Sequence, residues 1–124
     1  MQIISTPNAP AALGPYSQAI RANGMIYCSG QIPINPATGA IEAQTIEERT
    51  TQAITNLKNV LEKAGSSLAK VVKTTVFIKN MNDFVALNKV YAELFGDTKP
   101  ARSCVEVARL PKDVLVEIEC IAEA

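Results

Sequence analysis

The chain has 124 residues, of which 48% are hydrophobic and 19% are charged, and its formal net charge is zero. This length and composition predict one domain, residues 1–124, with a hydrophobic core. A neutral chain offers no electrostatic attraction to nucleic acid or to an anionic membrane, so neither partner is favoured. The absence of histidine excludes Ser-His-Asp and Cys-His nucleophile systems and the usual zinc sites with histidine ligands.

The three cysteines, Cys28, Cys104 and Cys120, are far apart in the sequence. An odd number without a Cys-x-x-Cys pair does not make a disulfide framework, so we expect a reducing compartment: the cytoplasm, or the mitochondrial matrix in a eukaryote. No apolar run approaches the roughly 20 residues of a membrane span. The N-terminus also lacks the basic segment and apolar core of a signal peptide.

A β-hairpin is the first predicted element. Residues 19–22 and 25–29 flank Asn23-Gly24, the dipeptide that best favours a type I′ turn. The two prolines and the glycine of residues 32–39 then predict a loop.

Two amphipathic helices follow. The first begins after Thr45, which forms a capping box with Glu48, and ends at Gly65. Its apolar face consists of Ile46, Ala53, Ile54, Leu57, Val60, Leu61 and Ala64. The second helix extends from about residue 82 to residue 95 and stops at Gly96. Its predicted buried face consists of Phe84, Leu87, Tyr91, Leu94 and Phe95.

The remaining segments predict strands. Residues 71–78 are rich in β-branched side chains and predict a central strand. Residues 100–110 and 114–122 predict a final pair of strands joined by a short corner. In the last strand, alternation directs Val116 and Ile118 towards the helices and Glu117 and Glu119 away from them. The order of elements predicts an α+β fold with a mixed sheet and both helices on one face.

The other face of that sheet combines apolar and acidic side chains. Leu115 and Ile121 share it with the two glutamates, which is too apolar for a simple solvent-exposed face. We therefore expect a partner subunit to cover at least part of this face.

Arg102 and Glu117 place charges in strands that are otherwise apolar. One interpretation is an ion pair at a solvent-facing edge of the sheet. The other is an anion site, because a planar guanidinium matches a carboxylate with two parallel hydrogen bonds. Asn88, on or beside the buried face of the second helix, is either bonded to backbone or placed at a site.

Short motifs distributed over the whole chain carry a family resemblance. They are an N-terminal segment at 8–16, Ser-Gly-Gln-Ile-Pro at 29–33, Val-Lys-Thr-Thr-Val-Phe at 72–77, Asn-Asp-Phe at 82–84, Pro-Ala-Arg-Ser-Cys-Val at 100–105 and Glu-Ile-Glu at 117–119. Together and in this order they resemble the Rid/YjgF family, specifically its RidA branch.

The resemblance implies a chorismate-mutase-like (bacillus type) fold in a homotrimer with a barrel-like core, and sites in clefts between subunits. It implies hydrolysis of reactive enamines and imines, such as 2-iminobutanoate and 2-iminopropanoate, to 2-oxo acids and ammonia. This activity would protect pyridoxal-phosphate enzymes from damage. No metal ion or organic cofactor is implied.

By position, the resemblance makes Arg102 the ligand of the substrate carboxylate. Glu117 would orient or activate the attacking water, or protonate the leaving amine, and Cys104 would line the site and help hold the water. The residues that would complete the pocket, from two subunits, are Tyr16, Ser29, Gly30 and Asn88.

Taken alone, several of these residues have simpler interpretations. Tyr16 is typical of a packed loop aromatic, and Ser29 of a strand-end cap that bonds to backbone. Cys104 has no histidine or lysine beside it and is typical of a small buried hydrophobe, so we predict no covalent catalysis.

Two other functions fit the same chain. One is a small-ligand binding or regulatory module that uses the same cleft without turnover. The other is an endoribonuclease that inhibits translation, which is disfavoured by the zero net charge, the absence of histidine and the small number of aromatic residues, three tyrosines and three phenylalanines.

Overall fold

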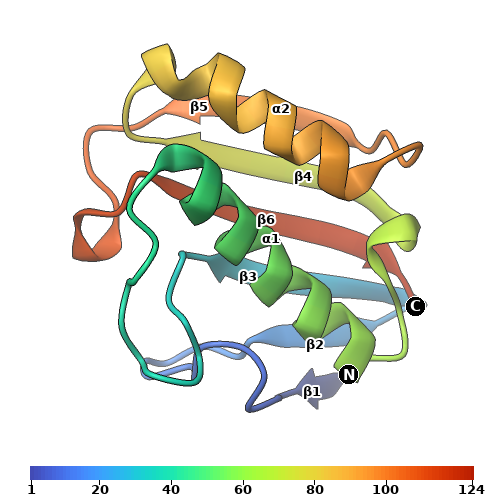
Figure 1. The fold of residues 1–124 in the computed structure, drawn as a ribbon. Helices are drawn as coiled ribbons and strands as arrows, with labels where there is room; N and C mark the ends of the chain where they lie inside the picture. The colour runs from blue at the N-terminus through green and yellow to red at the C-terminus, as the bar shows by residue number, and fades with distance from the viewer.

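The computed structural model describes residues 1–124 as a six-stranded mixed sheet with two helices on one face (Figure 1). The sheet order is β1-β2-β3-β6-β4-β5, and all neighbours are antiparallel except β4 and β5. The strands are β1 (Gln2–Ile4), β2 (Ala19–Ala22), β3 (Met25–Gln31), β4 (Val71–Ile78), β5 (Ala101–Glu106) and β6 (Val116–Glu123). The helices are α1 (Ile46–Lys63) and α2 (Phe84–Phe95).

Local signals in the N-terminal half are confirmed. The β2–β3 turn has positive φ at both Asn23 and Gly24, as a type I′ turn requires. The capping box of α1 is present, because the Thr45 hydroxyl accepts from the Glu48 backbone N–H and the Glu48 carboxylate accepts from the Thr45 N–H. Strand β1 was not predicted, since three residues are too few to show a periodicity.

Helix α2 packs on the sheet largely as predicted, and it ends at Gly96. A 3₁₀ turn, Met81–Asp83, precedes it, so the helix proper begins two residues later than expected. The prediction for Leu94 is wrong: its side chain is 38% exposed, and Val90 is buried in its place. In the last turn only one of two adjacent large side chains faces the sheet, and Phe95 takes that position.

The two C-terminal strands do not pair with each other, which corrects the predicted final strand pair. Strand β6 lies between β3 and β4, whereas β5 lies on the far side of β4 and runs parallel to it. The reason is the connection: α2 crosses over from β4 to β5, and a crossover helix joins parallel strands. The chain then returns to fill the position between β3 and β4, where Val116 and Ile118 are fully buried.

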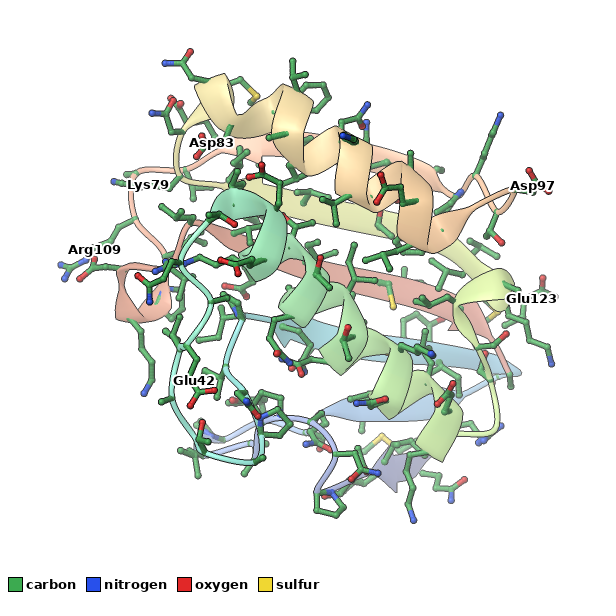
Figure 2. The ribbon with its side chains drawn as sticks, in the orientation of Figure 1. Glu42, Lys79, Asp83, Asp97, Arg109 and Glu123 are labelled. Carbon is green, nitrogen blue, oxygen red and sulfur yellow. The ribbon has the colours of Figure 1, made fainter.

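The core lies between the helices and one face of the sheet, and charged side chains project from the periphery (Figure 2). The opposite face of the sheet has no covering element within the chain. There Tyr27 is 44% exposed, and Glu117, Glu119 and Ile121 are half-buried. The predicted combination of apolar and acidic side chains on this face is thus confirmed for Ile121 and the two glutamates. Leu115 precedes β6 and packs against the core instead. No helix has the length and apolar character needed to cross a membrane.

Candidate active site in two halves

Arg102 lies on β5 and faces the helices, because its register partner on β4, Thr74, is fully buried on that face. One guanidinium N–H donates to the side-chain carbonyl oxygen of Asn88 at 2.8 Å. The guanidinium carbon lies 4.7 Å from the ring centroid of Tyr91 and 5.5 Å from that of Phe84. These contacts fix the cation between α2 and the sheet.

No carboxylate of the chain pairs with Arg102. The one salt bridge present joins Arg109 to Asp113 at 2.9 Å, on the surface. The alternative interpretation of an edge ion pair between Arg102 and Glu117 is therefore wrong. The guanidinium carries five N–H donors, and a single hydrogen bond, to Asn88, uses one of them.

Arg102 lines a cavity of about 300 Å³. Its lining consists of Asn88, Tyr91, Ala92, Phe95, Gly96, Thr98, Lys99, Pro100 and Arg102. Cys104 lies two residues along β5, on the same face, and packs partly buried against the core. Burial raises the pKa of its thiol, and nearby Arg102 opposes this only in part, so the neutral thiol is favoured.

The other predicted site residues gather on the uncovered face of the sheet. Tyr16, Ser29, Gly30 and Glu117 line one hollow of about 500 Å³, together with Ile32, Pro111 and Glu119. The Glu117 carboxylate lies over Gly30, so that a Cβ at position 30 would come within 2.9 Å of the carboxyl carbon. Any side chain at position 30 would therefore displace this carboxylate.

Ser29 connects β3 to the loop that carries Tyr16. Its hydroxyl donates to the Ser17 carbonyl at 2.6 Å, and its backbone N–H donates to the Gln18 carbonyl at 2.9 Å. The interpretation of Ser29 as a residue that bonds to backbone is thus confirmed, although it is not at the strand end, because β3 continues to Gln31. Tyr16 is 55% exposed, so the interpretation as a packed loop aromatic is wrong.

Glu117 is the site carboxyl with a perturbed pKa. Burial of the carboxyl, and secondarily the negative charge of Glu119, raise its pKa above the usual value. A carboxyl with a raised pKa holds a proton closer to neutral pH, which suits proton transfer.

The two groups of predicted site residues do not meet within one chain. Arg102, Asn88 and Cys104 are on the helix side at β5, whereas Glu117 is on the uncovered side of β6, and β4 separates the two strands. Sequence reasoning also left out Phe84 and Tyr91 as site residues, since helical periodicity assigned both to the core. The sequence feature that could have pointed to Tyr91 is Thr74, a polar residue in a buried row of β4.

The sequence and the fold place the chain in a known family of proteins. The sequence model of the family described as endoribonuclease L-PSP matches residues 6–124, and the chain belongs to this family, which is also called Rid/YjgF.

Individual relatives cover almost the full chain. A RutC family protein of Pyrococcus horikoshii is 56% identical over 121 residues, which are 98% of this chain and 96% of the relative. A 2-iminobutanoate/2-iminopropanoate deaminase of Escherichia coli is 52% identical over 122 residues, 96% of this chain and 94% of that protein. The crystal structure of Escherichia coli TdcF with bound serine has a TM-score of 0.95 at 44% identity, and the match covers 100% of this chain and 99% of that one.

Proposed function

We propose that this protein is an imine deaminase that hydrolyses 2-iminobutanoate, 2-iminopropanoate and the corresponding enamines to 2-oxo acids and ammonia. The observation that carries the proposal is Arg102, a fixed guanidinium in a cavity with no carboxylate partner of its own. Such a group matches a substrate carboxylate. The name of the Escherichia coli relative, a 2-iminobutanoate/2-iminopropanoate deaminase at 52% identity, supports the same substrate class.

The reaction needs few groups because the imine carbon is already electrophilic. Arg102 binds the carboxylate, and Glu117 holds a water molecule against the imine carbon. As the C–O bond forms, the π electrons of the C=N bond move to nitrogen. Glu117 takes a proton from the water and delivers it to nitrogen, which gives a carbinolamine. The same carboxyl then moves the hydroxyl proton of the carbinolamine to the amine, the C=O bond forms as the C–N bond breaks, and ammonia and the 2-oxo acid result. A carboxyl in this role contributes about 10²–10⁴-fold.

The function includes assembly as a homotrimer of chorismate-mutase-like (bacillus type) subunits, in which each site combines the Arg102 half of one copy with the Glu117 half of its neighbour. Two observations support this. Within one chain the two halves face opposite sides of the sheet. The sheet face that carries Glu117 also exposes Tyr27, an aromatic side chain that a neighbouring copy would cover.

Two other functions remain to be separated by experiment. TdcF has been crystallised with bound serine, a small molecule with a carboxylate, and this favours a ligand-binding module as the second candidate. The description of the family as an endoribonuclease favours RNA cleavage, but the zero net charge of this chain gives no electrostatic support for a polyanion.

The test is a coupled assay in which threonine dehydratase generates the imine and semicarbazide competes for it. We expect the wild-type protein to suppress semicarbazone formation. Arg102→Ala should lower kcat/KM on the order of a hundredfold or more, because two charge-assisted hydrogen bonds to the carboxylate are lost. Arg109→Ala is the matched control, since this arginine is exposed and pairs only with Asp113.

The outcome separates the candidate functions. Suppression that survives Arg102→Ala would contradict the proposed role of this arginine. If the wild-type protein leaves the semicarbazone signal unchanged but binds serine in calorimetry, the binding module replaces the enzyme.

A further inference from the structure

We propose that Tyr91, held in place by Thr74, is a positioning residue that sets the orientation of the Arg102 guanidinium for the substrate carboxylate. This inference rests on the proposed function, but one of its tests does not depend on catalysis. Tyr91 acts through Arg102 and is not itself assigned a contact with substrate.

The geometry forms a chain of three contacts. The Thr74 and Tyr91 hydroxyls are hydrogen-bonded at 2.7 Å, and both residues are buried. The Tyr91 ring stacks on Phe95, with centroids 4.5 Å apart and planes inclined by 29°. The guanidinium carbon of Arg102 lies 4.7 Å from the centroid of the same ring. The ring is thus held at its hydroxyl end and on one face while it contacts the cation.

Thr74 is the unexpected residue in this arrangement. It occupies a row of β4 in which Val76 and Ile78 are fully buried, and its own side chain is fully buried as well. A valine has nearly the same volume and would bury no polar atom, so packing alone favours valine at this position. The hydroxyl has one partner, the Tyr91 hydroxyl. The proposed role of this hydrogen bond, which is to hold the Tyr91 ring in place, explains why two hydroxyl groups lie in the core.

The contact with Tyr91 sets the direction in which the guanidinium N–H groups of Arg102 that have no partner point. Burial raises the pKa of Tyr91, so the phenol stays neutral and attracts the cation through its ring face. Asn88 holds one N–H, and the rings of Tyr91 and Phe84 lie near the guanidinium. Rotation of the guanidinium about its own bonds is restricted by these contacts, and the remaining N–H groups keep a fixed direction for a bidentate carboxylate.

The kinetic test compares Tyr91→Phe, Thr74→Val and the double variant. Each single change removes the same hydrogen bond and keeps the volume, so we expect each to lower kcat/KM about 3- to 10-fold. The loss should appear mainly as a higher KM, because Arg102 holds the carboxylate in both the ground state and the transition state. The double variant should lose no more than either single variant, since one shared interaction is removed.

Two controls separate positioning from general damage to the core. Thr74→Ser keeps the hydroxyl and should retain kcat/KM close to that of the wild type. Thr50→Val makes the same substitution at a fully buried threonine of α1 whose hydroxyl has no partner, and it should leave KM unchanged.

The second readout is NMR spectroscopy of the arginine side chains, and the chain has only four arginines to assign: Arg21, Arg49, Arg102 and Arg109. In the wild-type protein the Arg102 guanidinium should rotate slowly about its Nε–Cζ bond. Tyr91→Phe and Thr74→Val should both accelerate this rotation without affecting Arg109.

Unchanged guanidinium signals in both variants would overturn the inference, and so would altered signals with kcat/KM within twofold of the wild type. A wild-type protein without deaminase activity would refute the proposed function. In that case calorimetric binding of serine to the same variants, compared with their guanidinium signals, decides whether Tyr91 positions Arg102 for a carboxylate.

Discussion

The burial of the Glu117 carboxyl lowers the stability of the fold at neutral pH and suits the carboxyl to its proposed role in proton transfer. This carboxyl is half-buried beside Glu119, and both effects raise its pKa above the usual 4.5. The native state therefore keeps its proton at pH values where the unfolded chain has already lost it. It follows that the free energy of unfolding falls as the pH rises from about 4.5 through the native pKa.

Replacement of this carboxyl by an amide should raise the free energy of unfolding at pH 7 and lower the activity. We expect Glu117→Gln to match the wild type in urea unfolding at pH 4 and to be more stable at pH 7, while kcat falls on the order of 10²–10⁴-fold. Unfolding is measured at equal protein concentration, because the proposed assembly would contribute to stability. Glu93→Gln, at an exposed position of α2, controls for the loss of one negative charge. A Glu117→Gln variant that is less stable than the wild type at pH 7 would show that the carboxylate, not the acid, is the form the fold prefers.

At the scale of elements, the pairing of β3 with β6 brings Gly30 to Glu117. Cys28 lies opposite Cys120, and Gln31 lies opposite Ile118. Two residues of β3 therefore lie between these pairs, whereas β6 has only one residue there. The extra residue makes a bulge at Ser29 and Gly30. Bulges of this kind occur beside active sites, where they redirect a strand.

This pairing predicts a coupled effect of two substitutions. Gly30→Ala places a methyl group where the Glu117 carboxylate lies, so kcat should fall by about 10- to 100-fold. In a Glu117→Gln background, whose remaining activity does not depend on the carboxylate, Gly30→Ala should cost less than threefold. The measurement is kcat for the four proteins of this cycle. Equal losses in both backgrounds would mean that Gly30 acts on something other than Glu117.

The elements that the sequence predicts well are those with local causes. Asn23-Gly24 fixes its turn, and Thr45 with Glu48 fixes a helix start, because the atoms concerned are within a few residues of one another. The position of β6 between β3 and β4 has no local signal, so the two C-terminal strands were wrongly paired. Charges in otherwise apolar strands singled out Arg102 and Glu117 as either an edge ion pair or an anion site, and the choice of the site came from the family resemblance. It gave no reason to expect Thr74 and Tyr91, whose relation depends on how α2 packs on β4.

At the scale of the whole molecule, the separation of Arg102 and Glu117 means that the proposed site needs residues from two copies of the chain. Both are strand residues, so neither side chain can reach the other without crossing β4 or the plane of the sheet. A second copy that places its uncovered face against the β5 edge could bring the two halves together. Assembly would then be part of the chemistry, and a folded but isolated subunit would be inactive.

This arrangement predicts complementation between two inactive variants. Arg102→Ala supplies an intact Glu117 half, and Glu117→Gln supplies an intact Arg102 half. When equal amounts are unfolded together and refolded, the proposed trimers would form from both variants. About one site in four should then receive both intact halves, because each site draws them independently from two neighbouring copies. Deaminase activity should therefore return to about a quarter of the wild-type value, while each variant refolded alone stays inactive. Variants refolded separately and then mixed control for incomplete inactivation. If co-refolded trimers, verified by their mass, remain as inactive as the separate variants, the two halves do not belong to one intersubunit site.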